Sequence, residues 1–531
     1  MRQIGFKNFR RFKNFPSMSL APITIFVGEN NAGKSTVVKG ILALSDFLNR
    51  WNDDIDFFIG ERNDKTEKER KTSIIEYLKN QKFYFNTSYL AHIGTFKRAL
   101  YNKAENNIIS FYTKLGLQDL TIDVCGDKDN DEIVSGIISK INLDYQDFGI
   151  HIEFDLQMDS AIITFHPVTI FSDQINYLPD KIRNNAKEFL STISQTYELK
   201  YNISDYFRSF APELIFALTA SVEIAINSCM EFEKTEKYIG MEMLNKLKPI
   251  ENVDKETIKF LKKYTKNICL KQSENKNWIF RLPPDSRLIR NLFQIEYLYA
   301  HAVTQTVIYS AKDTNDYLSR TVHEFASMPK SDDDNRREFI TYWMKEFNIG
   351  KDYTITSVGG EAHIVKIRNH DGELVNLADK GMGSIQLMVL LFRLAITLPK
   401  KSLVDEGTKA RILRSRISRV IIIEEPEQNL HPMLQSKLAD LLFDLYEKYG
   451  YRFIIETHSE YLIRKTQVIV KENFNNEKNP LKDNPFKVFY FNSSDSEKPY
   501  YEIIYQKDGS FSNDFGKGFF DEASNLAYEI L

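Results

Sequence analysis

The chain has 531 residues, of which 42% are hydrophobic and 27% charged, so it is long enough for roughly two to four packed globular units. Its 70 basic and 73 acidic residues give a net charge of −3, which excludes a global positive field for nucleic acid and leaves only a local basic patch open. Cys125, Cys229 and Cys269 form no C-x-x-C pair, which argues against a zinc site or a disulfide framework and favours a reducing cytosol.

The first part of the chain predicts a buried strand, a helix and a run of strands. Residues 23–27 form a short apolar run that ends at Gly28, as buried strands do, and residues 35–42 predict a helix. Residues 50–80 are charge-dense and predict an exposed insertion, whereas residues 108–170 alternate like strands. Because no apolar leader segment precedes the first strand, we expect a cytoplasmic protein without a signal peptide.

The middle of the chain, residues 184–348, predicts a compact helical domain. Apolar residues recur there every three or four positions, and prolines interrupt the pattern before any heptad repeat is sustained, so no long coiled-coil arm is expected. The apolar stretches at 214–226 and 387–398 contain polar residues and fall short of the roughly 20 residues of a membrane span. We therefore expect buried helices and no membrane contact.

The remaining residues, 349–531, predict alternating strands and helices. Residues 352–376 alternate around Gly359 and Gly360 and predict a hairpin, and a helix is expected after Gly383. A very apolar strand at 420–423, a helix from about Pro432 and a strand at 453–455 follow. One or two further strands and a final helix complete the pattern.

The first motif, G-x-x-x-x-G-K-[ST], occupies residues 28–35 between the predicted strand and helix. Its glycines let successive backbone N–H groups point at phosphate oxygens, and the helix adds its positive N-terminal end. Lys34 is expected to bridge the β- and γ-phosphates, and the Ser35 hydroxyl to ligate Mg²⁺. The flanking strand and helix disfavour a chance match. The candidate nucleotide-binding residues are Gly28, Asn30, Asn31, Ala32, Gly33, Lys34, Ser35 and Thr36.

The second motif places two carboxylates at the carboxyl end of the apolar strand 420–423. Ligands bind at that end of the strands in open α/β sheets. Glu424 is expected to hold Mg²⁺ through its water shell, and Glu425 to orient or deprotonate the attacking water. Taken alone, a strand followed by an acidic solvated turn explains these residues equally well, and the phosphate loop favours the catalytic interpretation.

Two further motifs follow the same logic. His458 ends the next buried strand and is expected to reach the γ-phosphate, although a lone histidine there is more often structural. Gly381, Gly383 and Ser384 precede an apolar helix and predict a second anion site. On local evidence alone, an ordinary turn with a capping serine explains this last segment better.

Together, these four motifs resemble the ABC ATPase superfamily. The segments 6–12, 423–432 and 456–459 are similar to one branch, which contains the overcoming-lysogenization-defect (OLD) nucleases and their nuclease-free relatives in bacterial anti-phage systems. The resemblance implies an α/β fold, an ABC-type ATPase head whose mixed sheet has a P-loop core and an antiparallel β subdomain. It assigns residues 1–183 and 349–531 to the head and residues 184–348 to an inserted helical domain.

The resemblance also implies ATP and Mg²⁺ as cofactors and head-to-head self-association into a homodimer or larger oligomer. Gly381, Gly383 and Ser384 would contact the γ-phosphate across the interface, and Arg10 and Arg11 match a basic pair near the nucleotide in related ATPases. The chain departs from the superfamily in two respects. An Asp is usual where Glu424 stands, and the segment at 381–384 is not Leu-Ser-Gly-Gly-Gln.

The tail favours a nuclease-free member, because no Asp-x-Asp pair of a TOPRIM nuclease follows His458 and residues 518–523 are similar to the C-terminal element of such members. The resemblance then implies the ATPase subunit of a defence system such as Septu, which controls a partner nuclease or other effector. Contact with nucleic acid through that complex stays open. The main alternative is a DNA-engaging repair or SMC-type ATPase, and a transporter subunit or self-contained nuclease fits the motifs less well.

Overall fold

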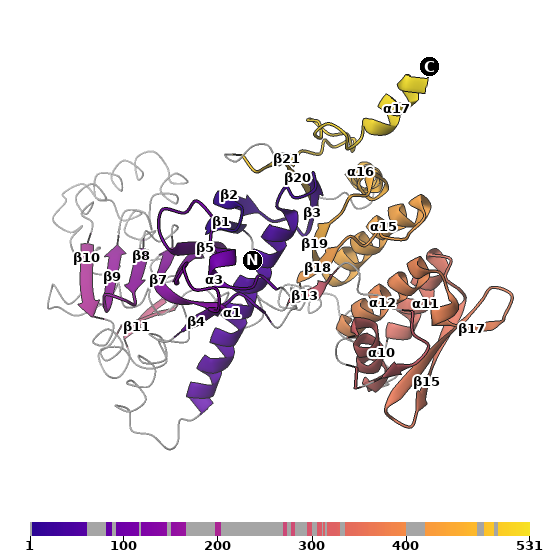
Figure 1. The fold of residues 1–531 in the computed structure, drawn as a ribbon, viewed down its shortest axis with the longest axis horizontal. Helices are drawn as coiled ribbons and strands as arrows, with labels where there is room; N and C mark the ends of the chain where they lie inside the picture. The colour runs from indigo at the N-terminus through magenta and orange to yellow at the C-terminus, as the bar shows by residue number, and fades with distance from the viewer. Residues whose placement is uncertain are drawn as a thin grey trace, which may run out of the picture. The chain divides into compact units, whose positions relative to one another are not determined.

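The computed structural model describes residues 3–60, 81–87, 92–115, 118–145, 150–165, 197–202, 269–272, 278–281, 295–299, 305–310, 312–313, 316–329, 335–399, 420–474, 483–492 and 498–530. The chain forms two compact units (Figure 1). The first unit contains Met1–Ser19 and Lys39–Phe293, and the second unit contains Leu20–Val38 and Gln294–Leu531. The phosphate-loop segment therefore belongs to the second unit, although the residues just before and after it belong to the first.

The first unit is built on a nine-stranded antiparallel sheet with the order β10-β9-β8-β7-β6-β5-β1-β2, in which β4 pairs with β7. One face of the sheet is aromatic, with the Phe6 ring centroid 5.3 Å from that of Phe9 and 5.8 Å from that of Phe111. The helix α1 (Lys34–Gly60) approaches this face closely, because a Cβ at Gly40 would lie 2.5 Å from the Phe6 ring. The strands predicted at 108–170 are confirmed as β5 to β9.

The elements of the first unit are β1 (Gln3–Phe9), β2 (Phe12–Ser19), β4 (Lys82–Tyr84), α3 (Phe96–Ala99), β5 (Ile108–Leu115), β6 (Gln118–Cys125), β7 (Ser135–Tyr145), β8 (Ile150–Asp155), β9 (Ser160–Phe165) and β10 (Tyr197–Asn202). A separate antiparallel pair consists of β11 (Cys269–Gln272) and β12 (Trp278–Arg281).

The second unit contains a six-stranded mixed sheet with the order β13-β18-β19-β3-β20-β21. The first five strands are parallel to their neighbours, and β21 pairs antiparallel with β20. Strand β3 is buried along its whole length and β18 has four buried apolar residues, as expected where both faces of a parallel sheet are covered. The six strands are β3 (Ile23–Gly28), β13 (Ile295–Leu298), β18 (Val420–Glu424), β19 (Arg452–Glu456), β20 (Phe486–Phe491) and β21 (Tyr500–Ile503).

Several helices and a smaller antiparallel sheet complete the second unit. The helix α15 (Pro432–Tyr449) begins after His431 with a proline in its first turn and ends at Gly450, which adopts the left-handed conformation that glycine favours. The other elements are β14 (Tyr309–Ser310), α10 (Tyr317–Ser327), α11 (Arg336–Glu346), β15 (Asp352–Val358), β16 (Ala362–Arg368), β17 (Leu374–Asn376), η4 (Leu377–Asp379), α12 (Met382–Thr397), α16 (Glu460–Phe474) and α17 (Glu522–Ile530).

A buried arginine joins three elements of this unit. Arg393 on α12 pairs with Glu296 on β13 and, at 2.5 Å, with Glu324 on α10. Its guanidinium also lies 5.8 Å from the ring centroid of Tyr317. Because a charge inside the protein is tolerated only when it is paired, this cluster fixes β13 and α10 against α12.

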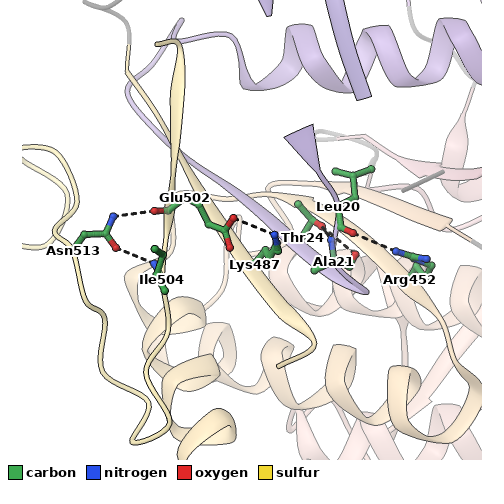
Figure 2. A network of polar contacts seen from close by, with 8 residues as sticks. All are labelled: Leu20, Ala21, Thr24, Arg452, Lys487, Glu502, Ile504 and Asn513. Carbon is green, nitrogen blue, oxygen red and sulfur yellow. Dashed lines mark hydrogen bonds and ion pairs between the residues drawn. The ribbon is translucent and has the colours of Figure 1, made fainter. Parts of the chain in front are cut away.

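Polar contacts also hold the sheet of the second unit together (Figure 2). Lys487 on β20 pairs with Glu502 on β21 at 3.1 Å, and Asn513 donates a hydrogen bond to the backbone carbonyl of Glu502 at 2.9 Å. Before β3, Arg452 of β19 donates to the carbonyl oxygen of Leu20 at 3.5 Å. These contacts fix the edge strand and the entry to the strand that carries the phosphate loop.

The predicted α/β fold with a P-loop core and an antiparallel sheet is confirmed, and so is the hairpin at 352–376. Strands β15 and β16 pair antiparallel, with positive φ at Gly359 and Gly360, and residues 387–397 lie in the buried helix α12. The stretch 214–226 and residues 61–80 of the predicted insertion lie outside the described residues, as does most of the predicted helical domain at 184–348.

The helical domain therefore stays a prediction, but the described residues inside its boundaries include the strands β10, β11, β12, β13 and β14. Residues 295–298 fall inside its boundaries but form β13, the edge strand of the central sheet. The helices α10 and α11 also fall inside these boundaries, and they pack against α12 in the second unit. No helix among the described residues is long and apolar enough to cross a lipid bilayer.

Candidate functional site

The loop at residues 28–34 has a backbone that its glycines make possible. Gly28 and Gly33 have φ angles of +126° and +111°, which side-chain-bearing residues rarely adopt. A Cβ on Gly28 would also collide with the backbone carbonyl of Phe491 on the neighbouring strand β20. Ala32 is buried, and Asn31, with a φ of +60°, is exposed with Asn30. The loop therefore curls between β3 and α1, as the motif predicts.

Lys34 begins α1 and is almost fully buried. Its ammonium donates hydrogen bonds to the carbonyl oxygens of Gly28 at 3.1 Å and of Glu29 at 2.9 Å. Burial lowers the pKa of Lys34, while the charges of Glu456 and Glu425 act in the opposite direction. The loop thus binds a largely desolvated ammonium group through its own backbone carbonyls. A negatively charged ligand would offset the cost of that desolvation.

Two carboxylates face each other at the carboxyl end of the central sheet. Glu424 ends β18 and Glu456 ends β19, and the two are register partners on neighbouring parallel strands. The Ser35 hydroxyl donates to Glu456 Oε1 at 2.9 Å. Burial, and then repulsion from Glu424, raise the pKa of Glu456 to about 7. Glu424 in turn forms a hydrogen bond with the hydroxyl of Tyr297 on β13.

Glu425 follows Glu424 in a strained turn. Its φ is +46°, which is uncommon for a residue with a side chain, and its backbone N–H donates to the Glu456 carbonyl at 2.7 Å. Its carboxylate accepts a hydrogen bond from the side-chain amide of Gln428. The side-chain amide of Gln386 donates to the Glu425 backbone carbonyl at 3.4 Å. These contacts restrain both the backbone and the carboxylate of Glu425.

His458 lies just beyond β19 and is exposed. Its backbone N–H donates to Glu427 Oε1 at 2.6 Å, and the preceding Thr457 N–H donates to the Phe26 carbonyl of β3 at 3.1 Å. Partial desolvation of the imidazole, and then the charge of Lys34, lower the pKa of His458. Both effects favour the neutral ring, in which one nitrogen donates and the other accepts.

The glycine-serine segment starts α12, with Gly381 as its N-cap residue. The N-cap is therefore Gly381 and not the serine: Ser384 lies inside the first turn, where its backbone N–H donates to the Gly381 carbonyl at 2.9 Å. A Cβ on Gly383 would collide with the carbonyl oxygen of Asn429. The segment therefore packs tightly against the loop that follows the paired glutamates. Its contact with a phosphate in another subunit stays a prediction.

Arg10 and Arg11 form the turn between β1 and β2, in the first unit. Arg10 has a φ of +51°, and its backbone N–H donates to the Ala99 carbonyl at 2.6 Å. Burial, and then the Arg98 charge, lower the pKa of Arg10. The other candidate residues all belong to the second unit. The role of this arginine pair near a nucleotide therefore stays a prediction.

Sequence reasoning missed several residues of the site. Glu456 belongs to the Glu-Thr-His-Ser block, but only its pairing with Glu424 shows that both carboxylates end neighbouring strands. Tyr297 comes from a segment predicted to be helical. Gln428 and Gln386, which hold Glu425, gave no sequence signal of their own.

The donor set suits a divalent cation that also binds phosphate. In the described part of the chain, no three His, Cys, Asp or Glu side chains form a group able to hold a metal ion. The site instead offers the Ser35 hydroxyl and the carboxylates of Glu424 and Glu456. The Oε2 atom of Glu456 is buried without a hydrogen-bond partner. Mg²⁺ typically uses one or two protein oxygens and completes its shell with water and phosphate oxygens, so these residues fit it.

Comparison with known proteins gives one family match. A family model described as "AAA ATPase domain" matches residues 1–463. No curated protein matches the chain. The structural similarities include the Smc head domain with an extended coiled coil bound to the C-terminal domain of ScpA, from Pyrococcus furiosus, at 11% identity and a TM-score of 0.33, covering 100% of this chain and 98% of that one.

Two further solved structures are similar at the same level. A SmcHead bound to the C-winged helix domain of ScpA is 9% identical with a TM-score of 0.32 and covers 94% of this chain and 97% of that one. The SMC head domain from Thermotoga maritima is 7% identical with a TM-score of 0.30 and covers 95% and 100% of the two chains.

Proposed function

The chain belongs to the AAA ATPase domain family and is an ATPase, and from that premise we propose that it couples Mg²⁺-dependent ATP hydrolysis to the control of a partner effector. The observation that carries this proposal is the convergence of the phosphate loop, the paired glutamates and His458 at one edge of the second-unit sheet. Strands β3, β18 and β19 are parallel and bring these residues, which are far apart in the sequence, to the same edge.

In this proposal, the triphosphate binds in the curled loop. The backbone N–H groups of residues 30–36 and the N-terminus of α1 surround its oxygens, and Lys34 exchanges its two carbonyl acceptors for the β- and γ-phosphates. The exchange is favourable because phosphate oxygens carry negative charge, whereas the carbonyls of Gly28 and Glu29 are only dipoles.

Mg²⁺ would be held by Ser35 and, through water, by Glu424. When bound, the ion neutralises charge that develops on the phosphate oxygens during transfer. The Ser35 hydroxyl already points at the carboxylates at the end of the sheet, since it donates to Glu456. Glu424 is itself fixed by the hydroxyl of Tyr297, so this side chain need not reorganise for catalysis.

Glu425 would act as the base that orients or deprotonates the attacking water. Its strained turn and its contact with Gln428 keep the carboxylate in one position, and a fixed base contributes more to hydrolysis than a mobile one. His458 would donate a ring hydrogen bond to the γ-phosphate.

Self-association would complete the site. We propose that Gly381, Gly383 and Ser384 of one subunit contact the γ-phosphate bound to another, in a homodimer or larger oligomer that forms with ATP. The subunits would then associate when ATP is bound and separate after hydrolysis. A nuclease or other effector partner, in an anti-phage system of the OLD-like or Septu type, would respond to this change in assembly. The support is the partly exposed position of this segment at the start of α12 in the second unit.

The test combines turnover, assembly and partner binding. We expect purified chain to hydrolyse ATP with Mg²⁺ and to gain mass in light scattering when Glu425→Gln protein binds ATP, while Glu472→Gln on the exposed face of α16 behaves like wild type. Co-expression with the products of neighbouring genes should recover an effector whose activity depends on ATP. Recovery of the chain alone, with strong DNA-stimulated turnover, would favour a repair or SMC-type ATPase instead.

A further inference from the structure

Glu456 has an environment that its structural contacts do not explain. Only 5% of its surface is exposed, and its Oε1 atom accepts the hydrogen bond of Ser35. The second oxygen, Oε2, is buried and has no hydrogen-bond partner. A buried carboxylate oxygen without a donor is costly, because water is lost and nothing replaces it.

The neighbour of Glu456 increases this cost. Glu424 is its register partner on β18, and neighbouring strands lie only about 4.8 Å apart. Register partners on parallel strands point to the same face of the sheet, so two carboxylates lie side by side at the end of the sheet. Like charges at this separation disfavour each other strongly when water is scarce.

The cation of the loop does not relieve the crowding directly. Lys34 donates hydrogen bonds to the carbonyls of Gly28 and Glu29, and it acts on Glu456 as a nearby positive charge. A small cation between the Ser35 hydroxyl and the two carboxylates would therefore have three oxygen ligands, one from the start of α1 and one from each of β18 and β19.

We propose that Glu456 is a direct part of the divalent-cation site, so that carboxylates from two neighbouring strands, and not from the Glu424 strand alone, serve the ion that accompanies the nucleotide. This inference rests on the proposed ATPase site. In it, the Oε2 atom of Glu456 faces the ion or one of its waters, while Oε1 keeps the Ser35 hydroxyl in place. Glu456 is thus a metal-site residue that also positions Ser35.

The competing explanation is that Glu456 only accepts the Ser35 hydrogen bond. Glu456→Gln separates the two, because the amide oxygen still accepts from Ser35 whereas the negative charge is lost. Glu427→Gln is the matched control. Glu427 is also a buried glutamate with an unpartnered Oε2, but its Oε1 accepts from the His458 backbone, away from Ser35.

The experiment measures Mn²⁺ binding in two steps, without relying on turnover. A fluorescent ATP analogue in EDTA first measures nucleotide affinity, which we expect to stay within about 3-fold of wild type in both variants, since Lys34 and the loop are unchanged. Electron paramagnetic resonance of free Mn²⁺ then measures the ion's affinity for each chain–nucleotide complex. Glu456→Gln should weaken it at least about 10-fold, as is typical for residues that support a metal site, and Glu427→Gln should not.

Each other outcome is decisive. Unchanged Mn²⁺ affinity in Glu456→Gln overturns the inference and leaves Glu456 as a structural acceptor. An equal loss in Glu427→Gln also overturns it, because the effect is then a long-range charge effect. If wild-type chain binds neither the analogue nor Mn²⁺ with nucleotide, the proposed ATPase site itself fails, and this is seen before any variant is compared.

Discussion

Replacing Glu456 by Gln should stabilise the nucleotide-free, metal-free chain at neutral pH. Burial and the Glu424 charge raise the pKa of Glu456 from 4.5 to about 7. The native state therefore holds a proton on this carboxyl more tightly than the unfolded state does. The stability that this proton provides is fully present below pH 4.5 and is lost as the pH rises through about 7.

The size of the effect follows from the two pKa values. Each whole pKa unit is worth about 1.4 kcal/mol, so the rise from 4.5 to about 7 corresponds to a loss of ~3 kcal/mol of unfolding free energy at pH 8. The Gln side chain resembles the protonated acid, carries no charge to desolvate and keeps an oxygen for Ser35. The unfolding free energy of Glu456→Gln should therefore not fall between pH 5 and pH 8 through this group.

Urea unfolding followed by circular dichroism, in EDTA at pH 5 and pH 8, measures this directly. We expect wild type and Glu456→Gln to have similar unfolding free energies at pH 5 and to differ by ~3 kcal/mol at pH 8, with the variant more stable. Titrating groups that do not interact with Glu456 affect both proteins equally and cancel in the comparison. Identical pH dependence in the two proteins would refute the description of Glu456 as a buried, crowded carboxylate.

Four further substitutions probe other parts of the site and its support. Lys34→Ala should weaken ATP binding about 100-fold, because a charged hydrogen-bond donor to the phosphates is lost, and fluorescent-analogue titration checks this. Glu425→Gln should keep ATP affinity while kcat falls roughly 10²- to 10⁴-fold in a phosphate-release assay. Gly383→Ala introduces a Cβ that collides with the Asn429 carbonyl, so it should cost about 1–3 kcal/mol in urea unfolding and lower turnover more than ATP affinity. Arg393→Met leaves two partly exposed glutamates without their cation and should cost about 1–3 kcal/mol in the same unfolding assay, whereas no measurable loss would show that the pairing is not structural.

The sequence predicts the loop at residues 28–34 and the strand β18 well because their structure is locally determined. Gly28 and Gly33 stand where the backbone adopts positive φ, which few other residues tolerate, and the strand and helix on either side follow directly. The apolar run before Glu424 similarly defines a buried parallel strand. In motifs of this kind, the residues of the motif themselves determine the local backbone conformation.

The partners of the candidate catalytic residues are not predictable in the same way. That Glu456 faces Glu424 depends on the register between β18 and β19, and Tyr297 reaches Glu424 because four residues of a segment with a helical pattern add an edge strand to the sheet. Both relations are set by long-range pairing, which local periodicity does not encode. Packing likewise decides that Gly383 contacts the Asn429 loop.

The most direct test of the whole account is a crystal structure of the chain with Mg²⁺ and a non-hydrolysable ATP analogue. We expect the triphosphate to occupy the loop at residues 28–36 with Lys34 on its β- and γ-phosphates, Mg²⁺ to contact Ser35, and His458 to face the γ-phosphate. A nucleotide bound elsewhere, or a loop nucleotide with its Mg²⁺ remote from Ser35 and the two strand-end glutamates, would contradict it.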